Sequence, residues 1–408
     1  MAKQAELLDV EEARRRILEH FHRLPAERVP LSEALGRVLA ESIDAALPLP
    51  PFANSSMDGF ALRAGCTSNA TSGNPFTLSV TETVAAGSAR QETLKVGDAA
   101  RIMTGAPLPP GADAVIPFEE VTERDAAIQV FAPVSEGACV RPAGNDFSAG
   151  QRLVDAGLEL GAPEIALIAA MGNDSAPVVR RPRVAILSTG DELVAPGEAR
   201  GPGQIYNSNT PMLWAAVLAA GGLAEALSVA ADDVYSLAQA MSRDEDCDLL
   251  LTSGGASVGD FDHVKTVLGE AGQVDFWRVR IRPGKPLIFG KLGKRPVLGL
   301  PGNPTSSMVT FEEFARPAIR AMLGAPPLRP EIEVIVDEPI DNHGGRETYA
   351  RVLLQRDGLE FHAVLAGKQD SAMLLPLARA DGLLRIPSDR SQVHPGDRAT
   401  VQVWRLPV

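Results

Sequence analysis

Cysteine is scarce in this chain. The 408 residues include three, Cys66, Cys139 and Cys247, which are widely spaced and odd in number. A disulfide scaffold and a CxxC metal site are therefore excluded, and a reducing compartment is favoured. Long apolar runs are also absent, so no transmembrane helix is predicted, and the charged N-terminus lacks the apolar core of a secretory signal. We expect a cytoplasmic protein.

Basic residues are also fewer than acidic residues. The chain has 39 Lys and Arg against 52 Asp and Glu, a formal net charge of −13. An acidic surface repels phosphodiester backbones and anionic membranes, so neither nucleic acid nor a membrane is an expected partner. Turn residues are plentiful instead, with 37 Gly and 32 Pro, which favours domains built from strands and tight loops.

The order of local patterns predicts four domains. Residues 1–46 and 144–180 have helical spacing, including a capping-box pattern at Asp9 and Glu12 and further helical stretches at 31–43 and 161–172. Residues 47–143 alternate as short strands, residues 181–326 alternate strand with helix, and residues 327–408 follow a Pro-rich joint as further strands. The predicted fold class is multi-domain α/β plus β. It has a central α/β domain with a mainly parallel sheet, a split helical domain and two smaller β-rich domains.

Four loops follow strands of the predicted α/β domain, where such sheets bind ligands. In Ser188–Leu193, hydroxyl groups suit a phosphate and Glu192 a metal, although the loop also fits a turn in which Asp191 caps a helix. In Thr252–Asp262, glycines and hydroxyls suit an anion at a helix start, and the loop matches neither a Walker nor a dinucleotide-binding motif. Asp260 and Asp262 suit a divalent cation, but Asp260 also fits a helix N-cap, which favours Asp262.

The other two loops are rigid. Arg282–Pro286 places two cations around a Pro-Gly turn, an arrangement suited to an oxyanion. Gly299–Ser306 fits a helix start with Pro304 in the first turn.

A set of motifs in fixed order makes the chain recognisable. NSSMDGFA, RIMTGAPLPPGADAV, STGDEL, TSGGASVGDFD, RPGKP and LPGNPTSS follow one another along the sequence. In this order they resemble the molybdopterin molybdenumtransferase family, the bacterial MoeA type related to the gephyrin E domain, over essentially the whole chain. The resemblance implies insertion of molybdate into adenylylated molybdopterin with Mg²⁺-assisted release of AMP, the last step of molybdenum cofactor biosynthesis. It also implies an elongated homodimer of four domains, in which the split helical domain serves dimerisation, the α/β domain binds the pterin and the active cleft is shared between subunits.

The resemblance also implies roles for individual residues. The implied catalytic residues are Asp58, Thr104, Asp146, Glu192, Asp232 and Asp262, of which Asp58, Glu192 and Asp262 would hold the metal. The implied substrate-binding residues are Arg141, Ser188, Thr189, Gly190, Ser253, Gly254, Gly255, Ser257, Arg282, Pro283, Lys285, Pro286, Pro301, Gly302, Asn303, Ser306, Arg346, Arg351 and Ser371. Two positions depart from the family pattern: Asn145 replaces a Glu, and Arg282 stands where many members have Lys.

Two other functions stay open at this point. An enzyme of related fold adenylylates molybdopterin with ATP, although such relatives consist essentially of the α/β domain. A non-catalytic scaffold is the second, although it would not need acidic and basic site residues together. The implied protein partners are the molybdopterin-adenylylating protein and molybdoenzyme acceptors. Molybdate and tungstate have the same charge and shape, so the sequence fits either oxyanion.

Overall fold

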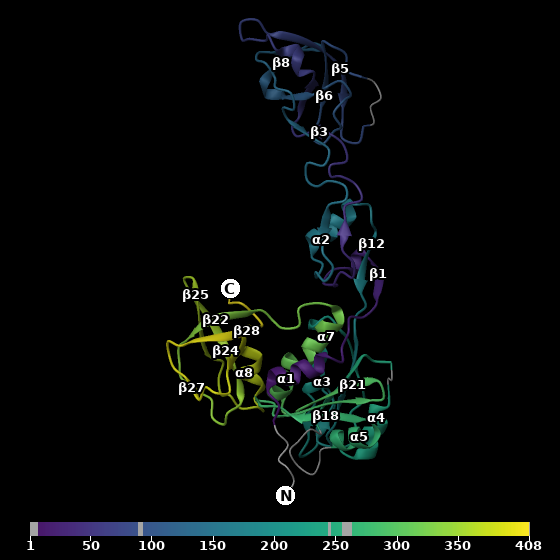
Figure 1. The fold of residues 1–408 in the computed structure, drawn as a ribbon. Helices are drawn as coiled ribbons and strands as arrows, with labels where there is room; N and C mark the ends of the chain where they lie inside the picture. Colours follow the sequence, from purple (N-terminus) through teal and green to yellow (C-terminus); the bar gives the residue numbers. More distant parts are fainter. Residues whose placement is uncertain (1–6, 89–92, 244–245, 255–262, 408) are drawn as a thin grey trace. The chain divides into compact units, whose positions relative to one another are not determined.

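The computed structural model describes residues 7–88, 93–243, 246–254 and 263–407 (Figure 1). The chain divides into two units, each described separately below. Unit 1 comprises Met1–Ala40, Gly157–Gly161 and Ser175–Val408, and unit 2 comprises Glu41–Ala156 and Ala162–Asp174. Segments of the predicted split helical domain therefore fall in both units, and the four domain boundaries stay a prediction.

A six-stranded sheet forms the centre of unit 1. Its strand order is β16 (Leu223–Ala226), β13 (Arg183–Ser188), β17 (Leu249–Ser253), β21 (Arg295–Leu300), β20 (Pro286–Leu292) and β18 (Gln273–Arg278). The first four strands are parallel, and β20 and β18 extend the sheet in antiparallel fashion. Because β13, β17 and β21 are parallel, the loops that follow them emerge at the same edge of the sheet.

Helices cover both faces of this sheet because its strands are apolar on both sides. Val184 and Ile186 pack with α3 (Asn209–Ala219) and the α6–α7 segment, whereas Ala185 and Leu187 pack with α4 (Val234–Met241) and α5 (His263–Ala271) (Figure 1). The long helix expected after the fourth loop has three parts: α6 (Pro304–Thr310), the π-helical turn η4 (Phe311–Ala315) and α7 (Arg316–Leu323). As predicted, Pro304 lies in its first turn.

The end of the chain forms a closed barrel within unit 1. Its strands are β24 (Glu347–Asp357), β25 (Glu360–Leu365), β22 (Glu331–Val336), β28 (Arg398–Val403) and β26 (Gly382–Ile386), and β26 pairs back onto β24. β19 (Ile281–Arg282), which belongs to the α/β part of the sequence, adds to β24 in parallel. The smaller elements here are α8 (Leu374–Arg379) and the pair of β23 (Ile340–Asp341) with β27 (Gln392–Val393).

The N-terminal part of unit 1 departs from the prediction in two places. Helix α1 (Val10–Leu18) begins after Asp9, but the predicted capping box does not form: the Asp9 side chain makes no cap hydrogen bond, and its Oδ1 lies 3.5 Å from Nε of Arg280. The second helix expected at 31–43 is limited to one 3₁₀ turn, η1 (Leu31–Glu33). Gly36 has a φ of +70°, a left-handed conformation that ends helical structure.

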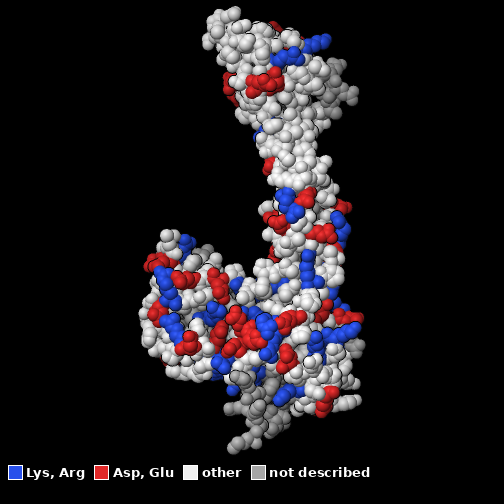
Figure 2. Space-filling model, viewed as in Figure 1, with Lys and Arg blue, Asp and Glu red and all other residues white. Residues whose placement is uncertain are grey.

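Short strand pairs complete unit 1. β1 (Ala26–Pro30) pairs with β12 (Ser175–Val179), and β14 (Leu193–Val194) pairs with β15 (Ile205–Tyr206). Acidic and basic side chains are interspersed on the face of this unit seen in Figure 2. Among the described residues, no helix has the length and apolarity needed to cross a membrane.

Unit 2 is mainly β, as its alternating sequence predicts. Its six-stranded sheet has the order β7 (Ala114–Pro117), β4 (Gly59–Leu62), β6 (Asp98–Ile102), β5 (Phe76–Val84), β9 (Ala127–Val130) and β8 (Val121–Arg124). Its smaller elements are the strands β3 (Asn54–Ser55), β10 (Val140–Arg141), β2 (Ile43–Asp44) and β11 (Arg152–Val154), the helix α2 (Ala162–Ala170), and the 3₁₀ turns η2 (Ala64–Thr67) and η3 (Phe118–Glu120).

Candidate active site

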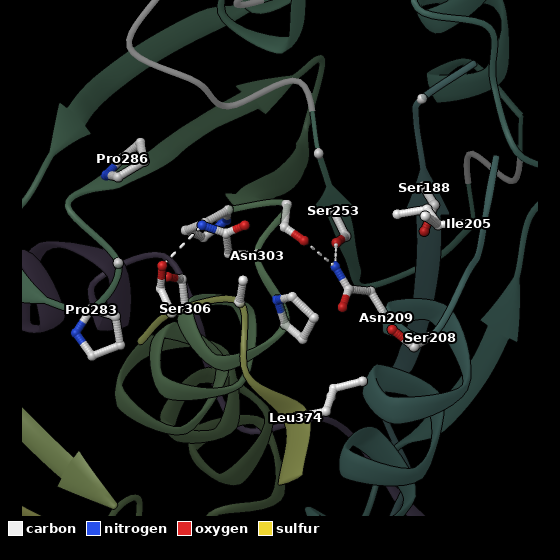
Figure 3. Close-up of a pocket in the computed structure, with 18 of the residues that line it drawn as sticks. Ser188, Ile205, Ser208, Asn209, Ser253, Pro283, Pro286, Asn303, Ser306 and Leu374 are labelled. Atoms are coloured by element: carbon white, nitrogen blue, oxygen red, sulfur yellow. Dashed lines mark hydrogen bonds between the residues drawn. The ribbon is translucent and has the colours of Figure 1, made fainter. Parts of the chain in front are cut away.

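A cavity of about 940 Å³ lies in unit 1 at the carboxyl ends of β13, β17 and β21 (Figure 3). The loops after these strands meet there with the loop before β20 and with two segments of the barrel, around Arg346 and Ser371. Seventeen of the residues implied from the sequence line it: Ser188, Thr189, Gly190, Glu192, Asp232, Ser253, Gly254, Arg282, Pro283, Lys285, Pro286, Pro301, Gly302, Asn303, Ser306, Arg346 and Ser371.

Two glycines let these loops approach other parts of the chain closely. Gly254 has a φ of +94°, and a Cβ there would lie 2.5 Å from the carbonyl oxygen of Thr189. Gly284 has a φ of +111°, and a Cβ there would lie 2.4 Å from Cγ2 of Thr310. Both positions therefore require glycine for conformation and for space, which explains Gly254 in the TSGG sequence and Gly284 in the RPGK sequence.

An amide side chain connects two of the loops. Nδ2 of Asn209, at the start of α3, donates to Oγ of Ser253 at 2.8 Å and to the carbonyl oxygen of Gly302 at 2.7 Å (Figure 3). A carbonyl oxygen accepts only, so the bond to Gly302 fixes which end of the amide faces the loops. Since Ser253 accepts from Asn209, its own hydroxyl proton remains available for donation to a ligand.

Sequence reasoning did not select Asn209. The stretch Asn207-Ser208-Asn209 stands just before a predicted helix and has the composition of an ordinary N-terminal cap, which hides its position at the cavity. Leu193, Gly284 and Pro304, from the loops named above, also line the cavity. Further lining residues that the sequence did not indicate are Ile205, Tyr206, Asn207, Ser208, Gln369, Asp370, Ala372 and Leu374.

Three cations, which we call the cationic wall, line the cavity: Arg282, Lys285 and Arg346. The parallel pairing of β19 with β24 places Arg282 opposite Thr348, two residues from Arg346. Burial, and then the nearby positive charge of Arg282, lower the pKa of Arg346. Such crowding of like charges is costly without an anion and favours binding of one.

Arg351 is not part of the cavity lining, although the sequence resemblance implies that it binds substrate. Its side chain is buried, and Nη2 donates to the carbonyl oxygens of Lys368 and Asp370, each at 3.2 Å. Burial lowers its pKa to about 10, which leaves the guanidinium charged at neutral pH. Arg351 thus supports the loop that presents Ser371, and Oγ of Ser371 accepts from Nδ2 of Asn303 at 3.0 Å.

Two exposed carboxylates, Glu192 and Asp232, line another part of the cavity. Oδ1 of Asp232 accepts from Oγ1 of Thr189 at 3.5 Å, and the Asp232 amide donates to Oδ1 of Asp191 at 3.1 Å. The alternative in which Asp191 caps a helix is therefore wrong, because its carboxylate faces the Asp232 loop and β14 follows it. Within the described residues, no group of three or more His, Cys, Asp or Glu side chains is arranged to hold a metal.

Four implied site residues lie in unit 2. Oδ1 of Asp58 accepts from the Thr104 amide at 2.7 Å and from Oγ1 of Thr104 at 2.8 Å, and these bonds lower the pKa of this exposed carboxyl. Arg141 and Asp146 are also exposed, on and after β10. None of these four belongs to the lining of the unit 1 cavity. The implied site residues Gly255, Ser257 and Asp262, and the alternative Asp260, lie outside the described residues.

Comparison with known proteins shows what this chain is similar to. Residues 8–172 match the MoeA N-terminal region (domain I and II), residues 185–321 a probable molybdopterin binding domain, and residues 333–404 the MoeA C-terminal region (domain IV). The chain is 38% identical over 405 residues to molybdopterin molybdenumtransferase 2 of Mycobacterium tuberculosis, which covers 97% of this chain and 99% of that protein. It is 32% identical over 404 residues to the molybdopterin molybdenumtransferase of Haemophilus influenzae, covering 97% and 98%.

A solved structure extends the likeness to the fold. The molybdopterin biosynthesis moea protein from Pyrococcus horikosii matches with a TM-score of 0.86 and 32% identity, covering 98% of this chain and 100% of that one. The multi-domain α/β plus β class predicted from the sequence is confirmed by this match.

Proposed function

The chain belongs to the MoeA family of molybdopterin molybdenumtransferases, and we propose on that premise that it inserts molybdate into adenylylated molybdopterin and releases AMP, the last step of molybdenum cofactor biosynthesis. The observation that carries the proposal is the cavity, in which a cationic wall, hydroxyl groups and carboxylates surround one volume.

The cationic wall suits the oxyanion. Molybdate is a tetrahedral dianion, and Arg282, Lys285 and Arg346 supply positive charge from a rigid turn and a strand end. The hydroxyl groups of Ser306 and Ser371 line the same cavity and add hydrogen-bond donors. Local positive charge of this kind offsets the repulsion that a chain with a net charge of −13 exerts on anionic substrates.

The loops at the sheet edge suit the pterin and the adenylate. Ser188, Ser253 and Gly254 offer small polar groups and backbone amides at the ends of β13 and β17. Because Ser253 accepts from Asn209, its hydroxyl can donate to a heterocycle rich in N–H and C=O groups.

The carboxylates suit Mg²⁺ in the manner usual for phosphate chemistry, where one or two carboxylates and the substrate phosphates share the ion. Glu192 and Asp232 would hold it at this cavity, with Asp58 and Asp262 as the further candidates from the sequence. The ion would neutralise charge on the departing AMP phosphate. Lys285 and Arg282, which line the same cavity, would add positive charge to the same neutralisation. The hydrogen bond from the Asp232 amide to Asp191 orients the loop.

The barrel favours molybdate insertion over adenylylation of molybdopterin with ATP. Arg346, Gln369 and Ser371 all come from the barrel and line the cavity. An enzyme that worked with the α/β domain alone would not need them.

The site residues implied for unit 2 are explained by the predicted homodimer. We assign Asp58, Thr104, Arg141 and Asp146 to the active cleft of a homodimer in which two copies share each site. The test mixes two inactive variants, Asp58→Ala and Arg346→Ala. If each site takes these residues from different copies, a 1:1 mixture recovers up to about a quarter of wild-type activity, because statistical exchange gives heterodimers one intact site. No recovery after verified subunit exchange would place both residues in a site from one copy.

The scarcity of cysteine supports a cytoplasmic location, where the adenylylating protein would supply the substrate and molybdoenzymes would accept the product.

The deciding experiment incubates purified protein with adenylylated molybdopterin, Mg²⁺ and either molybdate or tungstate, and measures AMP and mature cofactor together. We expect both products to appear in parallel and only with an oxyanion. ATP consumption without molybdate would instead indicate an adenylylating enzyme. Assembly with a partner protein without pterin binding would indicate a scaffold.

A further inference from the structure

Two consecutive carboxyl groups are buried in the π-helical turn between α6 and α7. Glu312 pairs with Arg329, with Oε2 at 2.7 Å from Nε and Oε1 at 3.0 Å from Nη2. Glu313 turns instead toward Arg14 of α1 and Tyr349 of β24. π-Helical turns are rare and occur often at functional sites. This one connects the α/β part of unit 1 to α1, to the joint before the barrel and to the barrel itself.

The hydrogen bonds around Tyr349 require an extra proton. The Tyr349 hydroxyl lies 3.0 Å from Oε2 of Glu313 and 2.7 Å from Oε1 of Glu347. A hydroxyl has one proton and can donate it to one carboxylate at a time. The second short contact is attractive only if the other carboxyl group is protonated and donates to the phenol oxygen. One proton shared by Glu313 and Glu347 satisfies both contacts and leaves a single negative charge opposite Arg14.

The pKa shifts of Glu313 and Tyr349 agree with this count. Burial raises the pKa of Glu313, and the Arg14 guanidinium opposes that rise. Burial, followed by the neighbouring carboxylates, raises the pKa of Tyr349 well above its ordinary value, so the phenol keeps its own proton. The groups that face the shared proton are Arg14 on α1, Glu313 on η4, Tyr349 and Glu347 on β24, and the uncharged Gln402 on β28.

The cluster lies one residue from the cationic wall. Glu347 directly follows Arg346, and its backbone amide donates to the carbonyl oxygen of Arg280 at 3.0 Å. Glu347 is also the register partner of Ile281, which precedes Arg282. A shift of Glu347 therefore moves both strands that present the arginines of the wall.

We propose that Glu313, Tyr349 and Glu347, joined by one shared proton, are positioning residues that hold Arg346 and Arg282 in place for the oxyanion. This inference rests on the proposed function, since it assumes that the cationic wall binds molybdate. None of the three side chains needs to touch substrate.

Tyr349→Phe removes the hydroxyl group that lies between Glu313 and Glu347. Tyr235→Phe is its matched control, because Tyr235 is exposed on α4. The readouts are molybdate affinity by calorimetry, which needs no turnover, and KM and kcat for molybdate in AMP release. We expect Tyr349→Phe to raise Kd and KM about fivefold and to leave kcat within about twofold, because small displacements of positioning groups weaken binding. A lower Tm with unchanged Kd and KM would overturn the proposal and leave a purely structural role.

Glu347→Gln tests the shared proton. The amide keeps a donor facing Tyr349 but has no proton to lose. Above the ordinary titration range of a glutamate, the wild-type Kd for molybdate should rise with pH as the shared proton is lost, because burial raises the pKa of Glu313. The Kd of Glu347→Gln should stay flat over that range. Parallel profiles for the two proteins would overturn the proposal. If wild-type protein does not bind molybdate or release AMP at all, it is the proposed function that fails.

Discussion

The two units hold their implied site residues in opposite ways. In unit 1, Asn209 joins two loops of the sheet edge and the buried Arg351 supports a loop of the barrel, so each group depends on segments far apart in sequence. In unit 2, Asp58 is exposed and held by Thr104 alone. Burial dominates the pKa of Arg351, whereas hydrogen bonds dominate the pKa of Asp58. The unit 1 residues are thus held by hydrogen bonds to more than one segment, whereas the exposed Asp58 carboxylate is held by one residue, Thr104, which is distant in sequence. Substitutions should reveal the difference.

The largest effect is expected at the cationic wall. Arg282→Ala should lower kcat/KM for molybdate about 100-fold or more, because it removes a charged donor from an oxyanion site. Arg280→Ala is the matched control, since Arg280 lies two residues earlier and faces Asp9 rather than the cavity. Kinetics of AMP release at varied molybdate provide the measurement. Equal losses in the two variants would show that the strand, and not the Arg282 charge, matters.

Asp58→Ala tests the exposed carboxylate that the sequence implies as a site residue of unit 2. We expect molybdate-dependent AMP release to fall about 100-fold, the usual range for loss of a catalytic carboxylate, with Tm unchanged because the side chain is exposed. Asp174→Ala, an exposed acid elsewhere in unit 2, should behave as wild type. Wild-type turnover in Asp58→Ala would remove Asp58 from the site.

Asn209→Leu should combine a loss of binding with a loss of stability, as expected for a side chain that joins two loops by hydrogen bonds. It leaves the Gly302 carbonyl without its donor and frees Ser253, so we expect about tenfold weaker binding of adenylylated molybdopterin and a lower Tm. Asn209→Asp should be at least as damaging, because a carboxylate would face the Gly302 carbonyl oxygen. Calorimetry and thermal unfolding provide the two readouts. Normal binding by Asn209→Asp would argue against a role for the Asn209 hydrogen bonds to Ser253 and Gly302.

The smallest effect concerns the pKa of Asp58. Thr104→Val removes the side-chain donor but keeps the backbone one, so the carboxyl pKa should rise part of the way toward its ordinary value, and protonation should begin at a higher pH. Thr104→Ser keeps the hydroxyl and should keep the lowered pKa. Carboxyl carbon chemical shifts followed by NMR titration report both. An unchanged pKa in Thr104→Val would mean that the backbone amide alone holds Asp58.

Local patterns predicted much of unit 1 correctly. Residues 181–326, predicted to alternate strand with helix, include the apolar run of β13 and the periodic stretches of α3 and α4. The helix prediction at 31–43 and the capping prediction at Asp9 failed, because in each case the conformation or contact of a single residue differs from what the surrounding pattern predicts. The helical spacing at 31–43 is interrupted by Gly36, which has a left-handed conformation. The Asp9 carboxylate does not cap the helix and lies near Arg280 instead. Both competing effects depend on conformation or on distant chain, which a local window does not contain.

The sequence alone determined the ordered motifs, the family they indicate and the strand–loop–helix units that end in glycine, proline and charged residues. These follow from periodicity and turn chemistry, which act over a few residues. Only the tertiary structure decided that Arg346 lies beside Arg282, that Asn209 bridges two loops, and that Arg351 supports the site from behind. These positions depend on strand pairing and burial, which are determined by contacts between segments far apart in the chain.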